Sequence, residues 1–211
     1  MLFQDDDYGR ELLAGLREGI ARSRVRVVAT QSYALTASGA QVQLARLKAS
    51  GATVLALLAN TRIATQAQAT WRPELVLVAA DGRAGQAAEG ALSLGFLKDP
   101  AELRWRDDPA IRLYRTLMAR YASGANVGDA RHVYGMAVAY ETVRVLKAAG
   151  QSPARGSLLA QLRRLNDPSN PFLLPGIEVE TSATERFPIE QAQLRRFTGG
   201  RWRAFGGLWG R

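Results

Sequence analysis

Short apolar runs alternate with stretches of helical spacing over about the first 90 residues of the chain. Leu12, Leu16 and Ile20 recur every four residues and therefore share one side of a helix. Aspartates precede this stripe, and their carboxylates can cap free backbone N–H groups at a helix start. The pattern predicts a helix that begins near Asp6 or Asp7.

The next segments continue the alternation. RVRVVATQSY contains Val25, Val27 and Val28 and predicts a buried strand. A helix over about 39–50 follows, and Gly51 ends it. TVLALLAN and PELVLVAAD predict two more strands, and TRIATQAQAT between them predicts a short helix. This order is typical of an α/β fold with a parallel sheet wrapped by helices.

The pattern changes after about residue 90. GALSLGFLKDP predicts a strand that leaves the sheet, and helices are predicted over about 108–123, 129–149 and 153–165. The positions expected on their apolar sides are Ile111, Tyr114, Leu117, Met118, Tyr121, Val133, Ala137, Tyr140, Val143, Leu146, Leu158, Leu159, Leu162 and Leu165. These sides need a sheet to cover them, and no run of strand residues lies between the three helices.

The last forty or so residues return to strand patterns. LLPGIEVETS predicts a strand, and QLRRFTGGRWRAF predicts a hairpin that turns at Gly199 and Gly200. Arginines in this segment alternate with Phe197, Trp202 and other aromatics. Proteins that bind single-stranded nucleic acid use the same combination of basic and aromatic side chains. Alternate strand residues face opposite sides, however, so Arg201 and Arg203 point away from an inward Trp202. We therefore expect an amphipathic hairpin that covers a lobe and no nucleic-acid partner.

Composition narrows the class of protein. The chain has 211 residues, of which 47% are hydrophobic and 22% charged, as in globular proteins. It has no cysteine, which excludes disulfides, thiol nucleophiles and thiolate metal sites, and its net charge of +9 modestly favours acidic solutes. No apolar run is long enough to span a bilayer, and no signal peptide is visible.

Catalytic and cofactor motifs are missing from the sequence. His132 is the only histidine, and no serine or cysteine nucleophile motif accompanies it. GRAGQAAEG does not have the spacing GxGxxG, and GxxxxGK[ST] does not occur. No carboxylate and histidine cluster has metal-ligand spacing. We expect a protein that is not an enzyme and holds no cofactor or metal.

Polar residues follow the predicted parallel strands, where ligands bind in this class of sheet. Those residues are Asp6, Asp7, Tyr8, Ser32, Tyr33, Asn60, Thr61, Asp81 and Gly82. A tyrosine offers an apolar face and one hydroxyl, which suits a small amphipathic solute. Structural roles are the alternative, because the aspartates and Asn60-Thr61 also suit helix caps and Asp81-Gly82 suits a turn.

The order of the motifs resembles a known family. FQDDDYGRELLAGLREGI is followed by YALTASGAQVQLARLKASGATVLALLAN, GFLKDP, DPAIRLYRTLMARY, HVYGMAVAYETVRVLKAAG and LLPGIEVETSATERFPIEQAQLRRFTGGRWRAF. The series resembles the type I periplasmic binding proteins of branched-chain amino-acid ABC transporters (leucine-binding-protein-like), from the strand-to-helix entry of their second lobe to their C-terminus. It covers essentially the whole chain.

This resemblance implies a function without chemistry. Two α/β lobes close on a small amino acid or organic acid in a cleft and deliver it to ABC permease subunits in the periplasm, so the membrane is met only through the permease. A ligand-sensing regulatory domain of the same fold is the alternative. The implied ligand-binding residues are Asp7, Tyr8, Tyr33, Asn60, Thr61, Asp81, Gly82 and Tyr134, with Asp81 placed to pair with a ligand ammonium.

The resemblance also implies a fragment that lacks most of the first lobe. We expect a second-lobe α/β domain over 1–92, a helical portion of the first lobe over 93–170, and return strands with the C-terminal hairpin over 171–211. Such a fragment should bind ligand weakly or not at all, since half of the cleft is absent. The uncovered helices over 108–165 should expose large apolar patches.

Overall fold

The computed structural model describes residues 1–79 and 88–210. The chain forms two compact units: unit 1 contains Met1–Gly95 and Gln193–Gly207, and unit 2 contains Phe96–Ala192 and residues 208–210. The chain therefore passes from one unit to the other after Gly95, after Ala192 and again after Gly207. The domain boundaries expected from the sequence, after residues 92 and 170, refer to the lobes of the family and stay a prediction.

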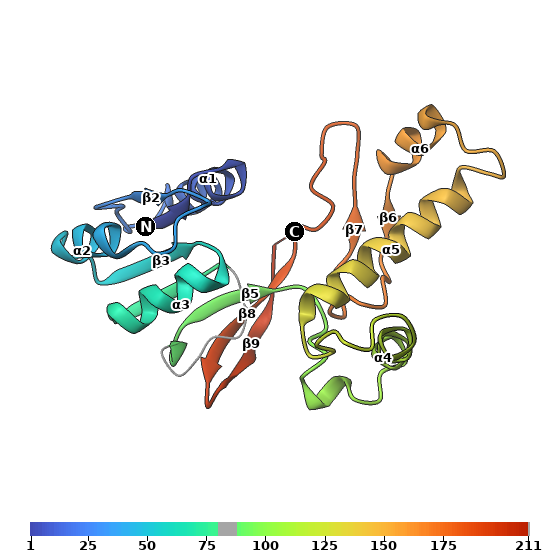
Figure 1. Ribbon diagram of the computed structural model, residues 1–211. Helices are drawn as coiled ribbons and strands as arrows, with labels where there is room; N and C mark the ends of the chain where they lie inside the picture. The colour runs from blue at the N-terminus through green and yellow to red at the C-terminus, as the bar shows by residue number, and fades with distance from the viewer. Residues whose placement is uncertain (80–87, 211) are drawn as a thin grey trace. The chain divides into compact units, whose positions relative to one another are not determined.

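Unit 1 is built on a sheet of mostly parallel strands, as predicted. In the described residues the sheet has seven strands in the order β2-β1-β3-β4-β5-β8-β9, in which β1 to β5 pair in parallel and β8 runs antiparallel to β5 (Figure 1). Its strands are β1 (Leu2–Gln4), β2 (Gln31–Tyr33), β3 (Val54–Leu58), β4 (Leu75–Val78), β5 (Leu92–Gly95), β8 (Ala192–Thr198) and β9 (Arg201–Trp209). Its helices are α1 (Asp7–Ile20), α2 (Gln41–Ala49) and α3 (Thr61–Thr70).

The C-terminal hairpin completes the core of unit 1. Phe197 of β8 and Trp202 of β9 are buried in the same cluster as Leu2 and Leu57, with their ring centroids 5.2 Å apart. Gly199 and Gly200 have φ of 61° and 78°, the left-handed conformation that a tight hairpin turn requires. The prediction of this hairpin and of an inward Trp202 is confirmed.

Arg195, one of the arginines in the predicted hairpin QLRRFTGGRWRAF, does not lie on the surface. It is on β8, two residues before Phe197, and is buried beside Gly95. Arg201 and Arg203 are exposed on either side of Trp202, as predicted. Because Arg195 is enclosed, it is not accessible to a phosphate backbone, and the nucleic-acid alternative loses one of its arginines.

The strand predicted over RVRVVATQSY is confirmed only at its C-terminal end. Val25, Val27 and Val28 are exposed and belong to no strand, and β2 begins only at Gln31. The physical reason is the length of its neighbour, because β1 pairs with β2 only from Leu2 opposite Gln31 to Gln4 opposite Tyr33. A β-branched run without a partner strand among the described residues does not enter the sheet.

Unit 2 consists mainly of helices. Its elements in the described residues are η2 (Leu103–Trp105), α4 (Pro109–Tyr121), α5 (Ala130–Ala148), α6 (Arg155–Leu162), and the antiparallel pair β6 (Asn166–Asp167) and β7 (Val179–Glu180). The core brings Ile111 and Tyr114 of α4 and Val133 of α5 together with Phe172 and Leu173 of the loop before β7. No helix in residues 1–79 and 88–210 is long and apolar enough to cross a membrane.

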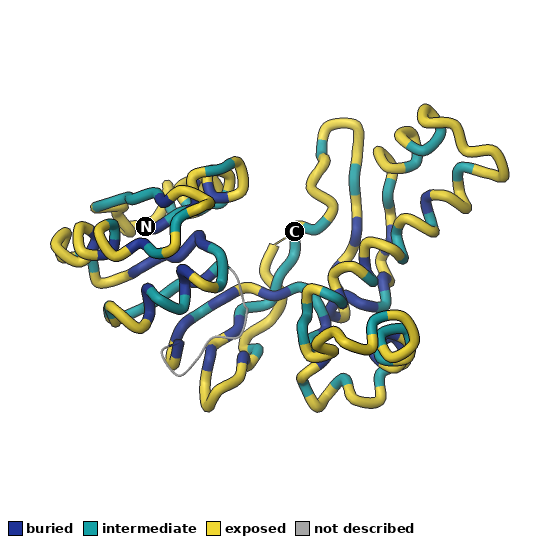
Figure 2. The backbone as a smooth tube through the Cα atoms, viewed as in Figure 1, coloured by how far each residue is buried: buried dark blue, intermediate teal, exposed yellow. Residues whose placement is uncertain are grey.

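The apolar sides predicted for these helices are only partly covered. Ile111, Tyr114, Val133 and Ala137 are buried, as predicted. The exposure expected of uncovered helices is confirmed elsewhere, since α6 has no buried residue (Figure 2). The exposed members of the predicted apolar sides are Tyr121, Val143, Leu146, Leu159 and Leu162. The two-residue strands β6 and β7 are too short to cover three helices.

Candidate functional site

The carboxyl ends of β1, β2 and β3 lie side by side in unit 1. Gln4 at the end of β1 is opposite Tyr33 at the end of β2, and Phe3 is opposite Leu58 at the end of β3. Helices α1 and α3 begin directly after β1 and β3. We call this part of unit 1, formed by residues 4–9, 33 and 60–63, the carboxyl edge.

A buried hydrogen-bond network holds the carboxyl edge together. The Tyr33 hydroxyl donates to Gln4 Oε1 at 3.1 Å and accepts from the Asn60 backbone N–H at 3.0 Å. The Asn60 side-chain amide also donates to Gln4 Oε1, at 3.2 Å. Gln4 Nε2 donates in turn to Asp6 Oδ2 at 2.5 Å. Three loops that are distant in sequence are thereby fixed to one glutamine amide.

Two of these residues also start helices. Asp6 Oδ1 accepts from the Gly9 N–H at 2.9 Å, and Asn60 Oδ1 accepts from the Ile63 N–H at 3.1 Å. The Gly9 N–H and the Gln4 amide lower the pKa of Asp6, so this carboxylate stays ionised at the start of α1. The positive ends of two helix dipoles therefore lie at the carboxyl edge, a place that favours an anionic group.

The predicted site residues of unit 1 divide into buried and exposed members. Tyr33 is 2% exposed, and burial raises the pKa of its hydroxyl, so it is a positioning residue within the network. Asn60 is used as a cap, and Thr61 begins α3 half-buried. By contrast the Asp7 side chain is 99% exposed and Tyr8 is 48% exposed. Asp7 and Tyr8 are therefore the members that a solute can reach.

The other predicted residues are not brought to this edge by the described structure. Asp81 and Gly82 lie outside the described residues. Tyr134 belongs to unit 2, on α5, where it is half-exposed and packs edge-to-face against Phe96 with ring centroids 6.3 Å apart. Their part in ligand binding stays a prediction.

Gln4 is the residue of this site that the sequence did not reveal. It is buried at the end of β1 and accepts or donates three of the network's hydrogen bonds. The only signal in the sequence is a polar residue between the apolar pair Leu2-Phe3 and the aspartates. Its place opposite Tyr33 depends on strand register, which a single sequence does not show.

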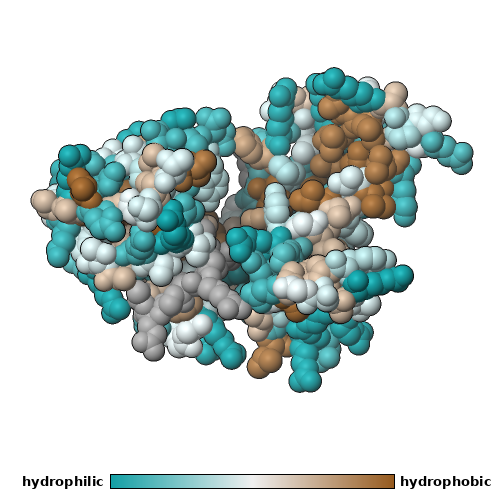
Figure 3. Space-filling model, in the orientation of Figure 1, coloured by the Kyte–Doolittle hydropathy of each residue, from teal (hydrophilic) through white to brown (hydrophobic). Residues whose placement is uncertain are grey.

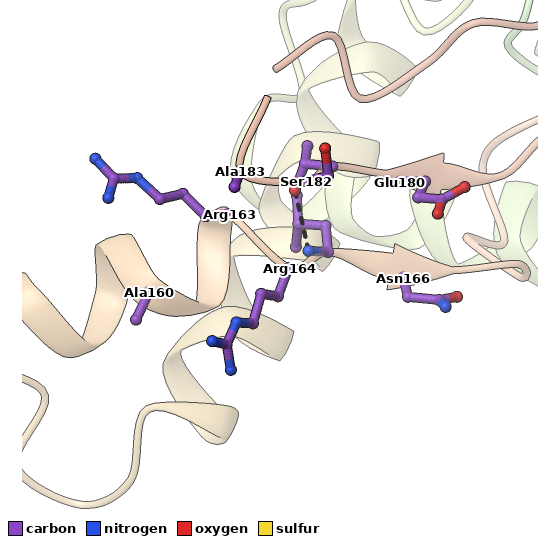
Figure 4. Close-up of a pocket in the computed structure, with 9 residues that line it drawn as sticks. Ala160, Arg163, Arg164, Asn166, Glu180, Ser182 and Ala183 are labelled. Atoms are coloured by element: carbon purple, nitrogen blue, oxygen red, sulfur yellow. Dashed lines mark hydrogen bonds between the residues drawn. The ribbon is translucent and has the colours of Figure 1, made fainter. Parts of the chain in front are cut away.

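A separate groove of about 530 Å³ lies in unit 2, between the end of α6 and the β6–β7 pair (Figure 4). It is lined by Ala160, Arg163, Arg164, Leu165, Asn166, Glu180, Thr181, Ser182 and Ala183. The Thr181 hydroxyl accepts from the Leu165 N–H at 3.0 Å and donates to the Leu162 carbonyl at 2.6 Å, so it is used by the backbone. Arg163 and Arg164 extend away from Ser182 (Figure 4). None of the described residues predicted to bind ligand lines this groove.

The comparison with protein families decides the class of the chain. A family model described as periplasmic binding protein matches residues 1–201. The chain belongs to the periplasmic binding protein family. This family consists of binding proteins, in agreement with the expectation that the chain is not an enzyme. No match was found among curated proteins.

Solved periplasmic binding proteins share the fold. A branched-chain amino acid ABC transporter protein from Thermus thermophilus with bound valine has a TM-score of 0.79 and 18% identity, over 100% of this chain and 59% of its own. A solute-binding protein from R. palustris in complex with benzoate has a TM-score of 0.73 and 17% identity, over 97% of this chain and 56% of its own. A leucine-binding protein from Thermotoga maritima has a TM-score of 0.69 and 15% identity, over 98% of this chain and 59% of its own.

These similarities define the fold of the chain as the type I periplasmic binding protein fold. At 15 to 18% identity they show the fold alone. This periplasmic binding protein chain spans between 56% and 59% of the length of those three structures.

Proposed function

We propose that the chain is the substrate-binding component of an ABC transporter, which binds a small amino acid or organic acid in the periplasm and delivers it to a permease. The family match over residues 1–201 carries this proposal. The names of the solved relatives support it, since they mention valine, benzoate and leucine. Each of these solutes contains a carboxylate.

The chemistry of the carboxyl edge supports the same class of solute. The N-terminus of α3, which is capped by the neutral Asn60, favours a carboxylate. The exposed carboxylate of Asp7 suits an ammonium group, and the ring of Tyr8 suits an apolar side chain. An α-amino acid offers all three groups, whereas benzoate lacks the ammonium. We therefore propose an amino acid as the preferred solute.

Calorimetric titration of the full-length gene product with valine, leucine and benzoate tests the proposal. We expect the variant Asp7→Asn to weaken amino-acid binding by about tenfold, because one charge-assisted hydrogen bond is lost, and to leave benzoate binding unchanged. Glu11→Gln is the matched control, since Glu11 is exposed one turn further along α1 and should change neither affinity. Equal losses for both classes of solute would show that Asp7 does not read the ammonium.

The delivery step needs its own measurement. Adding the protein with its solute to vesicles that contain the cognate permease and ATPase should stimulate uptake of the solute. Absence of binding to all three solutes contradicts the proposed function at its first step. Binding without stimulated uptake contradicts only the delivery step and favours the sensor alternative.

A further inference from the structure

Unit 2 contains a buried pair of carboxyl groups that the proposed function does not use. Glu141 is in the middle of α5, and Asp167 is the last residue of β6. Their side chains are 14% and 2% exposed. Both sit beside the loop that leads to Phe172 and Leu173 in the core of unit 2.

One carboxylate oxygen of each residue is well satisfied. Glu141 Oε1 accepts from Asn170 Nδ2 at 2.7 Å, and the same amide donates to the Ala137 carbonyl of α5 at 3.2 Å. Asp167 Oδ1 accepts from the backbone N–H of Ser169 at 3.0 Å and from its hydroxyl at 3.1 Å. These bonds join the middle of α5 to the turn at 167–170.

The other two oxygens share a single cation. Arg144 Nη1 lies 2.5 Å from Asp167 Oδ2 and 3.5 Å from Glu141 Oε2. Both oxygens are buried, and, apart from the two carboxyl groups themselves, no N–H or O–H group of the described residues meets them in hydrogen-bonding geometry. One guanidinium, itself partly exposed, thus faces two buried carboxyl groups. Two adjacent carboxylates are unfavourable in such a place, and a proton held between them removes the repulsion and supplies the missing donor.

We propose that Glu141 and Asp167 share one proton and form a pH-sensitive latch, which holds α5 against the turn at 167–170 and weakens when the proton leaves. The latch belongs to unit 2 and is independent of the proposed function. Among the described residues, the charged groups that face Glu141 are Arg144 from α5 and Asp167 from β6. Asn170 and Ser169 complete the surroundings as neutral partners.

Burial and the neighbouring carboxyl have the expected effect on the pair. Burial, followed by the hydrogen bond with Asp167, raises the pKa of Glu141 from 4.5 to about 7. Burial also acts to raise the pKa of Asp167, but the hydrogen bonds from Glu141 and Ser169 outweigh it and lower this pKa. The shared proton therefore resides on Glu141 and leaves near neutral pH.

The direction of the pH dependence follows from these shifts. A pKa that is higher in the folded chain contributes stability below the unfolded value of 4.5, and this contribution is lost as pH rises through about 7. The lowered pKa of Asp167 acts in the opposite sense, below its ordinary value of 3.8. The latch should thus be strongest between pH 3.8 and pH 4.5, weaken as pH rises from there, and be weak at pH 8.

Urea unfolding between pH 5 and pH 8, followed with the variant Glu141→Gln, tests the latch. We expect the unfolding equilibrium constant of the unmodified chain to rise by at least about tenfold over this range. Glu141→Gln, which cannot ionise, should lose most of that rise, and the exposed control Glu178→Gln should keep it. The same rise in Glu141→Gln as in the unmodified chain would overturn the proposal.

A second measurement does not depend on the variant folding. The carboxyl ¹³C resonance of Glu141 in the unmodified chain should titrate near pH 7, with a companion shift at Asp167. Titration of Glu141 at its ordinary pH, near 4.5, would overturn the proposal even if the variants were unstable. Hydrogen exchange of α5 and of residues 167–170 should be faster at pH 8 than at pH 5 after correction for intrinsic rates.

Discussion

The two units of this chain cover the apolar residues of their helices to different extents. In unit 1, α3 has Ile63, Ala64 and Ala67 buried in the same core cluster as Leu55 and Leu57 of the sheet. In unit 2 the helix α5 is apolar on more than one side, and only Val133, Ala137 and Val145 are buried. The difference teaches that a helix's apolar residues are set by sequence, whereas their burial depends on the layer that packs against it.

The uncovered side of α5 has a consistent character. Val143 and Leu146 are exposed large apolar residues toward the C-terminal end of α5, and exposed Leu159 and Leu162 belong to the neighbouring α6. Figure 3 shows apolar side chains gathered over this part of unit 2. Soluble proteins rarely expose a contiguous patch of this kind without a partner for it. We call these four residues the α5–α6 patch.

The largest effects should come from the two cores. Leu57→Ala in unit 1 and Ile111→Ala in unit 2 each remove a side chain with no exposed surface. Each should lower the free energy of unfolding by about 3 kcal/mol, from lost apolar burial and the cavity left behind. Urea unfolding measures both. A loss of less than about 1 kcal/mol for Ile111→Ala alone would show that the core of unit 2 is loosely packed and would widen the contrast.

A smaller effect is expected where α1 meets β1 in unit 1. A Cβ at Gly9 would lie within 1.9 Å of the Gln4 carbonyl oxygen, so Gly9→Ala must push α1 away from the strand end. We expect a loss of about 2 kcal/mol in urea unfolding. Gly15→Ala in the same helix has open space around it and should instead stabilise by about 0.5–1 kcal/mol. Equal results for the two glycines would disprove the close approach.

The smallest effect on stability is expected at the α5–α6 patch. Leu146→Gln should change the free energy of unfolding by less than about 0.5 kcal/mol, because the side chain is already exposed. It should nevertheless reduce concentration-dependent association in sedimentation velocity, since an apolar contact surface is lost. Thr142→Gln, a polar exchange at an exposed position of α5, serves as the control. Unchanged sedimentation in Leu146→Gln would mean that the patch does not drive association.

Local patterns in the sequence predicted local structure well. TRIATQAQAT forms α3 over Thr61–Thr70, Asp6 caps α1, and the hairpin turns at Gly199 and Gly200. Each of these depends on neighbours within a few residues. The strand predicted over RVRVVATQSY forms only at Gln31–Tyr33, because strand formation needs a partner and β1 reaches only to the level of Gln31.

The sequence also predicted only part of the candidate site, because it shows the order of strands and helices but not the contacts between distant residues. The order of strands and helices placed Asp7, Tyr8, Tyr33, Asn60 and Thr61 at one edge of the sheet, which the structure confirms. It could not show that the Tyr33 hydroxyl is used by Gln4, since that contact crosses 29 residues.

The burial of Arg195 agrees with the alternation of inward and outward residues along β8. Arg195 has the same strand parity as Phe197, so alternation alone places it on the buried side.

The three passages of the chain between the units affect how the protein is made. Phe197 and Trp202, which help to fill the core of unit 1, are synthesised about a hundred residues after Gly95. A nascent chain emerging from the ribosome therefore has to keep the sheet of unit 1 unfinished, with its inner face open, while the whole helical unit is translated. Chaperone dependence during translation is the expected cost of this order.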